Sequence, residues 1–301
     1  MDFSLTADQT ALSTALERLA SRHQNVGVDF RDFALEGQEL EQELIGGEFF
    51  DLAAVPELGP VAAVLTVERL ARLPCTAEVA LSTLVRSRLP GGQWPRPLAL
   101  VEDGRPGRFV ASARTVLMAR GDCLGVALVA EDAAEAVDSI YAYPMGRLTK
   151  PVALTTLSSR EAATLRTWLR VALAAEAAGL MQAAIDRVVE HLTVRKQFGR
   201  PLGSFQALRH RMAECAVLAG GVKWLALKAA STGNDADAAL AAFHAQESAT
   251  RIVFDLHQML GAMGMTLEHP LHLWTYRLKV LVSELGGRAA QAQAVVRHCF
   301  S

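Results

Sequence analysis

Residues 195–214 read RKQFGRPLGSFQALRHRMAE, and in this stretch one long helical pattern ends and another begins. Arg195 closes an Ala-rich helical pattern, at a position where the helix dipole favours a positive side chain. An aromatic–glycine pair that begins at Phe198 follows, and a proline and a glycine then break the helix. Ser204 is placed to cap a new helix that starts at Phe205. The stretch therefore predicts a helix–turn–helix corner within a helical fold.

The chemistry of this corner leaves two interpretations open. Arg195 and Phe198 suit an anionic ligand with a flat aromatic part, because a guanidinium forks onto phosphate oxygens and a ring stacks on a heterocycle. The alternative is a capped helical hairpin whose basic end is solvated and binds nothing.

The helical pattern before the corner is unusually long. Ser158 and Glu161 form an S-x-x-E capping box, and an unbroken helical pattern runs from there to Arg195. A helix of that length exceeds the usual globular range and predicts a helical bundle. Further helices are predicted over residues 204–231, 235–261, 270–285 and 288–299.

In the first half of the chain, the sequence pattern changes from helical to β-type near residue 92. Thr6 and Gln9 form a capping box that begins a helix ending near residue 22. From 93 to 157, short β-type runs alternate with Gly, Pro and Asp, which predicts a small sheet of four to six strands. The fold class is therefore mainly α with a small β-domain. Other early helices are predicted over 37–46, 60–73 and 76–88, and the domains over 1–92 (N-terminal helical), 93–157 (β) and 158–301 (C-terminal helical bundle).

Composition narrows the classes of function. The 301 residues are 51% apolar and 21% charged, with a net charge of −2, so nothing favours nucleic acid or a membrane surface as a partner. The four cysteines are scattered without metal-ligand spacing, so we expect neither disulfides nor a metal site. With no signal-peptide pattern and no uncharged apolar run of about 18 residues, we expect a cytoplasmic protein.

Two motifs together resemble the acyl-CoA dehydrogenase family. The order R-K-x-F-G-x-P-L-x-x-F-Q, which starts at Arg195, is similar to one motif of that family. A second family motif, Q-x-x-G-G-x-G-[FY]-T-x-E-[YH], has its counterpart from Gln258 to His269, where Ala262 replaces the second glycine. The opening MDFSLTADQTAL is also similar to the start of these enzymes. The resemblance is good over about 158–301 and weaker over the first 95 residues.

The resemblance implies a fold, a reaction and a cofactor. The family has N-terminal helices, a middle β-sheet and a C-terminal bundle, and it oxidises acyl-CoA thioesters to α,β-unsaturated products with FAD. Its FAD lies at a subunit boundary, where the neighbour's bundle contacts the pyrophosphate and the adenine. The residues of this chain that match those neighbour-facing positions are Arg195, Gln197, Phe198, Leu202, Phe205, Gln206, Gln258, Gly261 and Ala262.

The groups that would complete an active site within one chain are not evident. The family segment that holds the flavin ring, Y-x-x-T-E-P-x-A-G-S-D, has no counterpart between 96 and 157. The two family positions for the catalytic base fall on Leu285 and Leu169. Glu284 is one residue away, a rotation of about 100° on a helix, and is interpreted as a solvated helix-end carboxylate. Glu176 is interpreted as a helix-surface charge, so we assign no catalytic residue.

The resemblance therefore suggests a partner. Shortened acyl-CoA dehydrogenases of this kind resemble the paired subunits of bacterial steroid and bile-acid side-chain degradation, which assemble as α2β2 tetramers. We expect this chain to be the subunit without a base, which completes the FAD site of a hetero-oligomer acting on an acyl-CoA. Two alternatives stay open: a self-sufficient homo-oligomeric dehydrogenase that uses Glu284 or another acid, and a non-catalytic scaffold subunit with a degenerate cofactor site.

Overall fold

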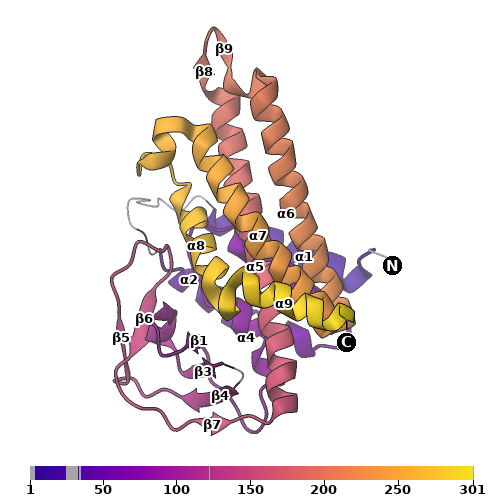
Figure 1. Ribbon diagram of the computed structural model, residues 1–301, viewed down its shortest axis with the longest axis vertical. Helices are drawn as coiled ribbons and strands as arrows, with labels where there is room; N and C mark the ends of the chain where they lie inside the picture. Colours follow the sequence, from indigo (N-terminus) through magenta and orange to yellow (C-terminus); the bar gives the residue numbers. More distant parts are fainter. Residues whose placement is uncertain (1–3, 25–32, 34, 122, 301) are drawn as a thin grey trace.

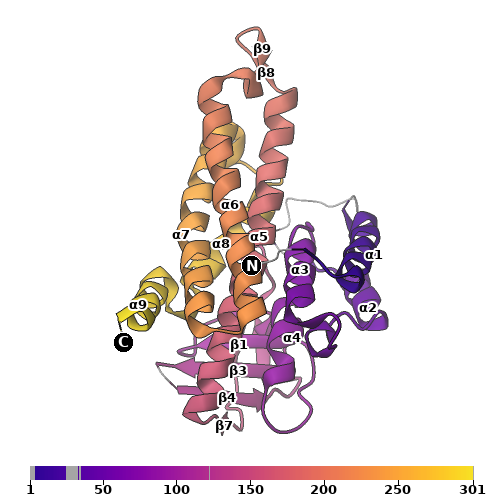
Figure 2. The same cartoon turned by 90° about the vertical axis from the view of Figure 1, so that its right-hand side faces the viewer.

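The computed structural model describes residues 4–24, 33, 35–121 and 123–300. Helices from the two ends of the chain surround a long central helix, and two small β-sheets lie at one end of that assembly (Figure 1). A view turned by 90° shows the N-terminal helices on one side of the central helix and the C-terminal helix on the other (Figure 2). The predicted class, mainly α with a small β-domain, is confirmed.

The N-terminal helices follow the predicted pattern closely. The Thr6–Gln9 capping box is present, with both reciprocal hydrogen bonds at 3.2 Å. The predicted helix over 76–88 is instead a short helix followed by a 3-10 turn. The elements are α1 (Ala7–His23), α2 (Gln38–Gly46), η1 (Leu52–Ala54), α3 (Gly59–Ala71), α4 (Ala80–Leu84) and η2 (Arg86–Arg88).

The strands of the β region form two sheets rather than the single sheet that was predicted. The first has the order β1-β3-β4-β7, with β1 parallel to β3 and the other pairs antiparallel. The second has the order β2-β6-β5 and is antiparallel. The strands are β1 (Leu98–Glu102), β2 (Gly107–Arg108), β3 (Thr115–Arg120), β4 (Cys123–Leu128), β5 (Ala134–Ala136), β6 (Met145–Leu148) and β7 (Thr155–Thr156), with η3 (Val110–Ser112) between β2 and β3.

Alternation along β1 divides its side chains between two cores. Leu98 and Leu100 belong to the main core with the helices, whereas Ala99 and Val101 belong to a second core within the β region. Successive side chains on a strand point to opposite faces, so the first sheet is covered on both sides. The sheets are therefore fixed directly against the helical bundle.

The bundle matches the predicted helices to within about three residues at each end. The Ser158–Glu161 capping box is present and begins the long helix, as predicted. The helices are α5 (Ser159–Val194), α6 (Gln206–Thr232), α7 (Asp235–Leu260), α8 (His272–Ser283) and α9 (Gly287–Phe300), with 3-10 turns η5 (Gly261–Met265) and η6 (Glu284–Gly286) on either side of α8. The division of the chain into three domains stays a prediction.

The long helix α5 is the centre of the bundle. Among the described residues it alone is long and apolar enough to cross a membrane, but 89% of its most apolar window is buried inside the protein. It packs against α3, α6, α7 and α8. Its apolar composition is therefore explained by its place in the core.

Gly179 allows α3 to approach α5 closely, and we predict that an alanine there destabilises the protein. A Cβ atom at this position would lie 2.1 Å from the backbone oxygen of Glu68, so the helices would have to separate. We expect Gly179→Ala to lower the free energy of unfolding by about 1–3 kcal/mol, measured by urea denaturation. Gly220→Ala is the control, because nothing lies within 4 Å of its Cβ position on α6. Removing a helical glycine there should stabilise the protein by about 0.5–1 kcal/mol; equal effects at both sites would contradict the close-approach argument.

Candidate functional site

The corner predicted at 195–214 contains a β-hairpin that the sequence did not predict. β8 (Lys196–Gln197) pairs with β9 (Arg200–Pro201), and η4 (Leu202–Ser204) leads into α6. Phe198 and Gly199 form the turn with φ values of 54° and 79°. Positive φ at both central residues is the signature of a type I′ turn, whose twist matches a tight hairpin. The hairpin projects beyond the end of the helical bundle (Figure 1).

The prediction that Ser204 caps α6 is wrong. The N-cap of α6 is Phe205, and no side chain caps it. The Ser204 hydroxyl instead donates to the Pro201 carbonyl oxygen at 2.7 Å. Because the 3-10 turn η4 lies between the proline and α6, the hydroxyl satisfies a carbonyl behind it and not the first amides of the helix.

The side chain of Phe198 is held out in solvent at the tip of the hairpin. It is 89% exposed, and its neighbour in the turn, Gly199, is also exposed. A left-handed conformation costs a residue with a side chain about 1–2 kcal/mol. The sequence therefore places a large apolar ring in a strained and solvated position, which points to a role outside the isolated chain.

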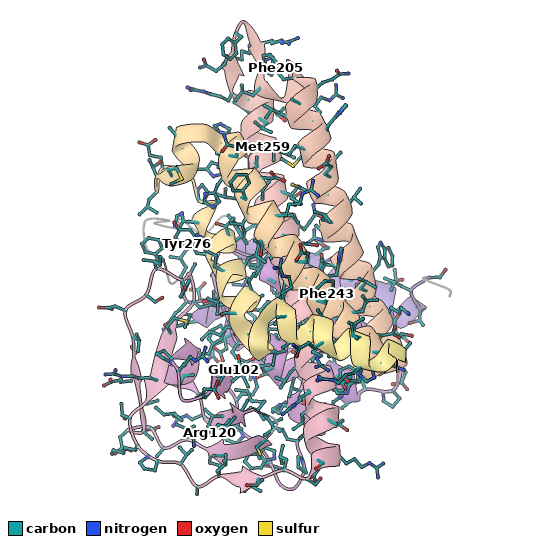
Figure 3. The ribbon with its side chains drawn as sticks, viewed as in Figure 1. Glu102, Arg120, Phe205, Phe243, Met259 and Tyr276 are labelled. Atoms are coloured by element: carbon teal, nitrogen blue, oxygen red, sulfur yellow. The ribbon has the colours of Figure 1, made fainter. Side chains whose placement is uncertain are left out.

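One other aromatic residue of the first motif contacts that ring. The Phe205 ring meets Phe198 edge-on with centroids 6.1 Å apart, and the Arg200 guanidinium lies 4.0 Å above Phe205. Phe205 lies near the tip of the molecule in Figure 3. The six predicted residues of the first motif thus lie on one continuous segment that comprises the end of α5, the hairpin, η4 and the start of α6. Arg195, Gln197, Phe198 and Gln206 are exposed, and Leu202 and Phe205 are half-buried.

The second motif lines a groove between α7 and α8. Gln258, Gly261 and Ala262 belong to its lining, and its volume is about 720 Å³. Gly261 has φ 61° and ψ −133°, a combination open in practice only to glycine. Gly264 is needed for a different reason, since a Cβ there would lie 2.5 Å from the His257 backbone oxygen. Ala262 is exposed and is not among the residues with positive φ, so its methyl group is accommodated without backbone strain.

Both motifs lie at the same end of the bundle. The His191 ring near the end of α5 meets the His269 ring, at the end of the second motif, with centroids 5.7 Å apart. Burial lowers the pKa of both histidines, and that of His269 falls to about 4. Across the described ranges, no group of three His, Cys, Asp or Glu residues could hold a metal ion.

A buried ion cluster lies between the β region and the bundle. Arg108 on β2 donates to both carboxylate oxygens of Glu284, at 2.7 and 3.2 Å, and to Glu176 on α5 at 2.6 Å. The Tyr143 hydroxyl donates to the other Glu176 oxygen at 2.7 Å. The side chains of Arg108, Glu176 and Glu284 are only 8%, 10% and 14% exposed. Burial alone would lower the pKa of Arg108, but the two carboxylates outweigh it and raise that pKa.

The interpretation of Glu284 and Glu176 as solvated surface charges is wrong. Leu285 has φ 57°, so the chain turns sharply after Glu284, whose carboxylate is paired with Arg108. The two partners are 176 residues apart in the sequence, and no spacing or motif signals their contact. Glu284 is thus part of a structural ion pair, and the position after it is an apolar residue.

Further polar contacts tie the β region to the bundle at the same place. Arg277 is fully buried and donates to backbone oxygens of Ala142, at 2.8 Å, and of Leu73, at 2.9 Å. The Leu285 amide donates to Glu102 at 2.9 Å, and burial raises the pKa of that carboxyl group. Sequence reasoning missed Arg108, Tyr143, Arg277 and Glu102, because their partners come from distant segments.

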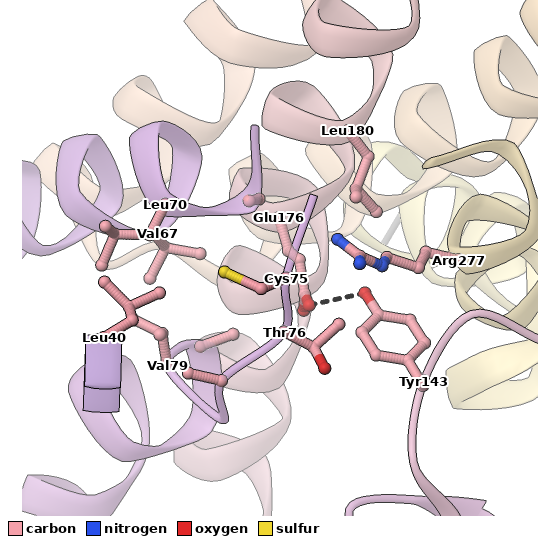
Figure 4. A pocket seen from close by; sticks show the side chains of 13 residues that line it. Leu40, Val67, Leu70, Cys75, Thr76, Val79, Tyr143, Glu176, Leu180 and Arg277 are labelled. Carbon is pink, nitrogen blue, oxygen red and sulfur yellow. Dashed lines mark hydrogen bonds between the residues drawn. The ribbon is translucent and has the colours of Figure 1, made fainter. Parts of the chain in front are cut away.

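Little space remains beside this cluster. The cavity bordered by Tyr143, Glu176 and Arg277 has a volume of about 20 Å³ (Figure 4). That volume is about enough for one water molecule. The second family position for a base, Leu169, is a buried apolar residue on α5. This cavity between α5, α8 and the loop at Tyr143 is thus far too small for an acyl chain.

Comparisons with known proteins identify the bundle. Residues 162–299 match the family described as "Acyl-CoA dehydrogenase, C-terminal domain". "Acyl-CoA dehydrogenase FadE34" of Mycobacterium tuberculosis is 38% identical over 122 residues, which are 38% of this chain and 17% of the relative. "Acyl-CoA dehydrogenase IpdE2" of Mycolicibacterium smegmatis is 32% identical over 128 residues, 42% of this chain and 41% of the relative. The matched region thus spans less than half the length of these curated relatives.

Solved structures show the fold of the whole chain. Butyryl-CoA dehydrogenase of Megasphaera elsdenii superposes with a TM-score of 0.80 at 17% identity and full coverage of both chains. The ChsE4–ChsE5 complex of Mycobacterium tuberculosis gives 0.79 at 20% identity, with 99% of each chain covered. Residues 162–299 therefore form an acyl-CoA dehydrogenase C-terminal domain, and the chain has the acyl-CoA dehydrogenase fold. The family resemblance and the predicted fold are both confirmed.

Proposed function

We propose that this chain, with its acyl-CoA dehydrogenase C-terminal domain, is the subunit that completes the FAD site of a hetero-oligomeric acyl-CoA dehydrogenase and lacks a catalytic base. The observation that carries the proposal is the hairpin arm at residues 195–201, whose ring at Phe198 is strained and 89% exposed. Such a ring is explained if it packs against a group bound mainly in a neighbouring subunit.

The side chains of the hairpin arm suit the phosphate and adenine groups of FAD. Arg195 would pair with the pyrophosphate, since a guanidinium offers several donors to phosphate oxygens. Gln197 and Phe198 would contact the cofactor beside it, and Leu202, Phe205 and Gln206 would lie near the adenine. Gln258, Gly261 and Ala262 would bring backbone and amide groups close to the phosphates from the α7–α8 groove. The chemistry that FAD supplies when bound is hydride acceptance from the acyl thioester.

Three features support the absence of a base. A general base must reach the substrate proton and be free to take it. Glu284 is bound on both oxygens by Arg108, and the family positions for the base are occupied by Leu285 and Leu169. The cavity beside Glu176 holds about 20 Å³. The partner subunit would therefore supply both the base and the acyl-binding cavity, and the self-sufficient alternative that uses Glu284 is disfavoured.

The nature of the partner follows from the solved complexes that this chain resembles. ChsE4–ChsE5 and the Tcur3481–Tcur3483 steroid acyl-CoA dehydrogenase are both named as paired proteins, and the latter gives a TM-score of 0.74 at 22% identity. They support a second acyl-CoA dehydrogenase-like subunit and an acyl-CoA of the steroid type. An α2β2 assembly is the form of hetero-oligomer that we propose. We place the assembly in the cytoplasm.

The visible spectrum of purified protein tests this proposal. We expect the chain expressed alone to be colourless, and its complex with a second, co-expressed acyl-CoA dehydrogenase-like subunit to be yellow and active. In that complex Glu284→Gln should retain turnover, because Glu284 carries no proton in the reaction. A chain that is yellow by itself and oxidises an acyl-CoA, or a complex that Glu284→Gln inactivates while flavin remains bound, would overturn the proposal.

A further inference from the structure

Positive charge is concentrated at the hairpin end of the bundle. Residues 195–213 contain five of the chain's 30 Lys and Arg residues and none of its 32 Asp and Glu residues. The rest of the chain, with 25 cationic against 32 acidic residues, therefore carries a net charge of −7. The hairpin projects beyond the bundle at this end (Figure 1). The chain thus presents a positive arm on a body of net negative charge.

Two cations of the hairpin have no part in the proposed contacts with FAD. Lys196 on β8 and Arg200 on β9 are both exposed, and neither has an ion-pair partner in the part of the chain that the structure describes. The strand register pairs Lys196 with Pro201 and Gln197 with Arg200. Because successive side chains on a strand point to opposite faces, Lys196 and Arg200 lie on opposite faces of the hairpin. Each face therefore carries an unpaired positive charge.

The hairpin is fixed firmly to the bundle. The Leu202 amide donates to the Arg195 carbonyl oxygen at 2.8 Å, directly behind the paired strands. The 3-10 turn η4, which follows the hairpin, packs against both α5 and α6. The Arg200 guanidinium is held over the Phe205 ring. The arm is thus ordered before a partner binds, which lowers the entropic cost of association.

We propose that Lys196 and Arg200 bind acidic side chains that line a cleft of the partner subunit, and that they steer the hairpin into that cleft. An acidic surface attracts the hairpin and repels the rest of the chain, so the charge distribution favours one orientation of approach. A charge on each face of the hairpin suits a cleft with acidic walls on both sides. This inference rests on the proposed function, in which the same hairpin contacts FAD bound mainly in the partner.

The rate at which the two subunits associate tests the inference. The probe is the second acyl-CoA dehydrogenase-like subunit, immobilised on a biosensor. In the double variant Lys196→Glu, Arg200→Glu, we expect the association rate constant to fall about tenfold or more at low ionic strength, since steering raises such rates by about 10- to 1,000-fold. The difference should shrink to about twofold in about 1 M salt, where charges are screened within about 3 Å.

Two further double variants separate steering from total charge and from local structure. Arg147→Glu, Lys150→Glu reverses two exposed charges of the β region and changes the net charge by the same amount. It should slow association far less than the hairpin variant does. Lys196→Arg, Arg200→Lys keeps both charges of the hairpin and should stay within about threefold of the parent rate.

The outcomes distinguish this inference from the proposed function. An unchanged rate in the hairpin variant at low ionic strength, or equal losses in the hairpin and β-region variants, would overturn the inference. If the complex assembles with flavin at a rate that salt does not alter, the proposed function stands and the steering role fails. If the hairpin charges control assembly of a complex that holds no flavin, the steering role stands and the proposed function fails. Loss of single-stranded DNA binding without slower subunit association would assign these charges to a nucleic acid and contradict the inference.

Discussion

Arg108→Met is expected to lower the free energy of unfolding by about 3–5 kcal/mol, the usual cost of removing one partner from a buried ion cluster. Glu176 and Glu284 would then be two buried carboxylates without their shared cation, and Tyr143 alone could not compensate both. The methionine keeps most of the apolar volume, so the loss is mainly electrostatic. Urea denaturation of the isolated chain measures it.

Two further variants make this prediction specific. Arg114→Met removes a surface arginine whose partner Glu131 is also exposed, so its effect should stay below about 1 kcal/mol. The triple variant Arg108→Met, Glu176→Gln and Glu284→Gln should recover part of the stability, because no uncompensated charge remains. If Arg108→Met lowers the free energy of unfolding no more than Arg114→Met does, the cluster does not stabilise the packing of the β region on the bundle.

The second large effect is expected in the complex with the partner subunit. Arg195→Ala should reduce FAD affinity by about 10- to 150-fold, since a charge-assisted hydrogen bond is worth about 1.5–3 kcal/mol. Phe198→Asn should also reduce flavin retention, because it removes the exposed ring. The flavin-to-protein absorbance ratio after gel filtration measures both losses.

Phe198→Asn also separates function from folding. Asn-Gly is the favoured sequence of a type I′ turn, and asparagine tolerates positive φ better than phenylalanine. The isolated variant should therefore be at least as stable as the parent chain while its complex loses flavin. Arg209→Ala removes an exposed arginine just beyond the motif on α6 and should retain flavin. Normal flavin content in Arg195→Ala would favour the scaffold alternative, in which the cofactor site is degenerate.

The cluster also bears on the proposed role as a supporting subunit. Arg108, Tyr143 and Arg277 fill the region between the β-sheets, α5 and α8 with an ion cluster and buried hydrogen bonds, and the cavity beside them is about 20 Å³. The hairpin lies at the other end of the bundle, beside Phe205 near the tip of the molecule (Figure 3), and the α7–α8 groove extends along α8 as far as Val282. The closed region stabilises the chain, and the open end is available to a neighbour.

The sequence by itself determined the helices, because the signals that define them are local. The capping boxes at Thr6 and Ser158 and the breaks around Pro201 act within a few residues, so they predicted where α1, α5 and α6 lie. The two motifs likewise located the residues of the candidate half-site. These signals could not predict the conformation of the corner. A proline and a glycine end a helix, but they are compatible with a β-hairpin and with a 3-10 turn alike.

Only the tertiary structure decided whether the acidic residues are exposed to solvent or buried in ion pairs. Glu176 and Glu284 have the local sequence of surface charges, and each is buried by an arginine from β2. Their contacts span 68 and 176 residues, and no local preference encodes a pairing at that distance. Whether a carboxylate is free to act on a substrate or is fixed in an ion pair depends on which segments the fold brings against it. Here the β region packs on α5 and α8, and this packing places Arg108 beside both carboxylates.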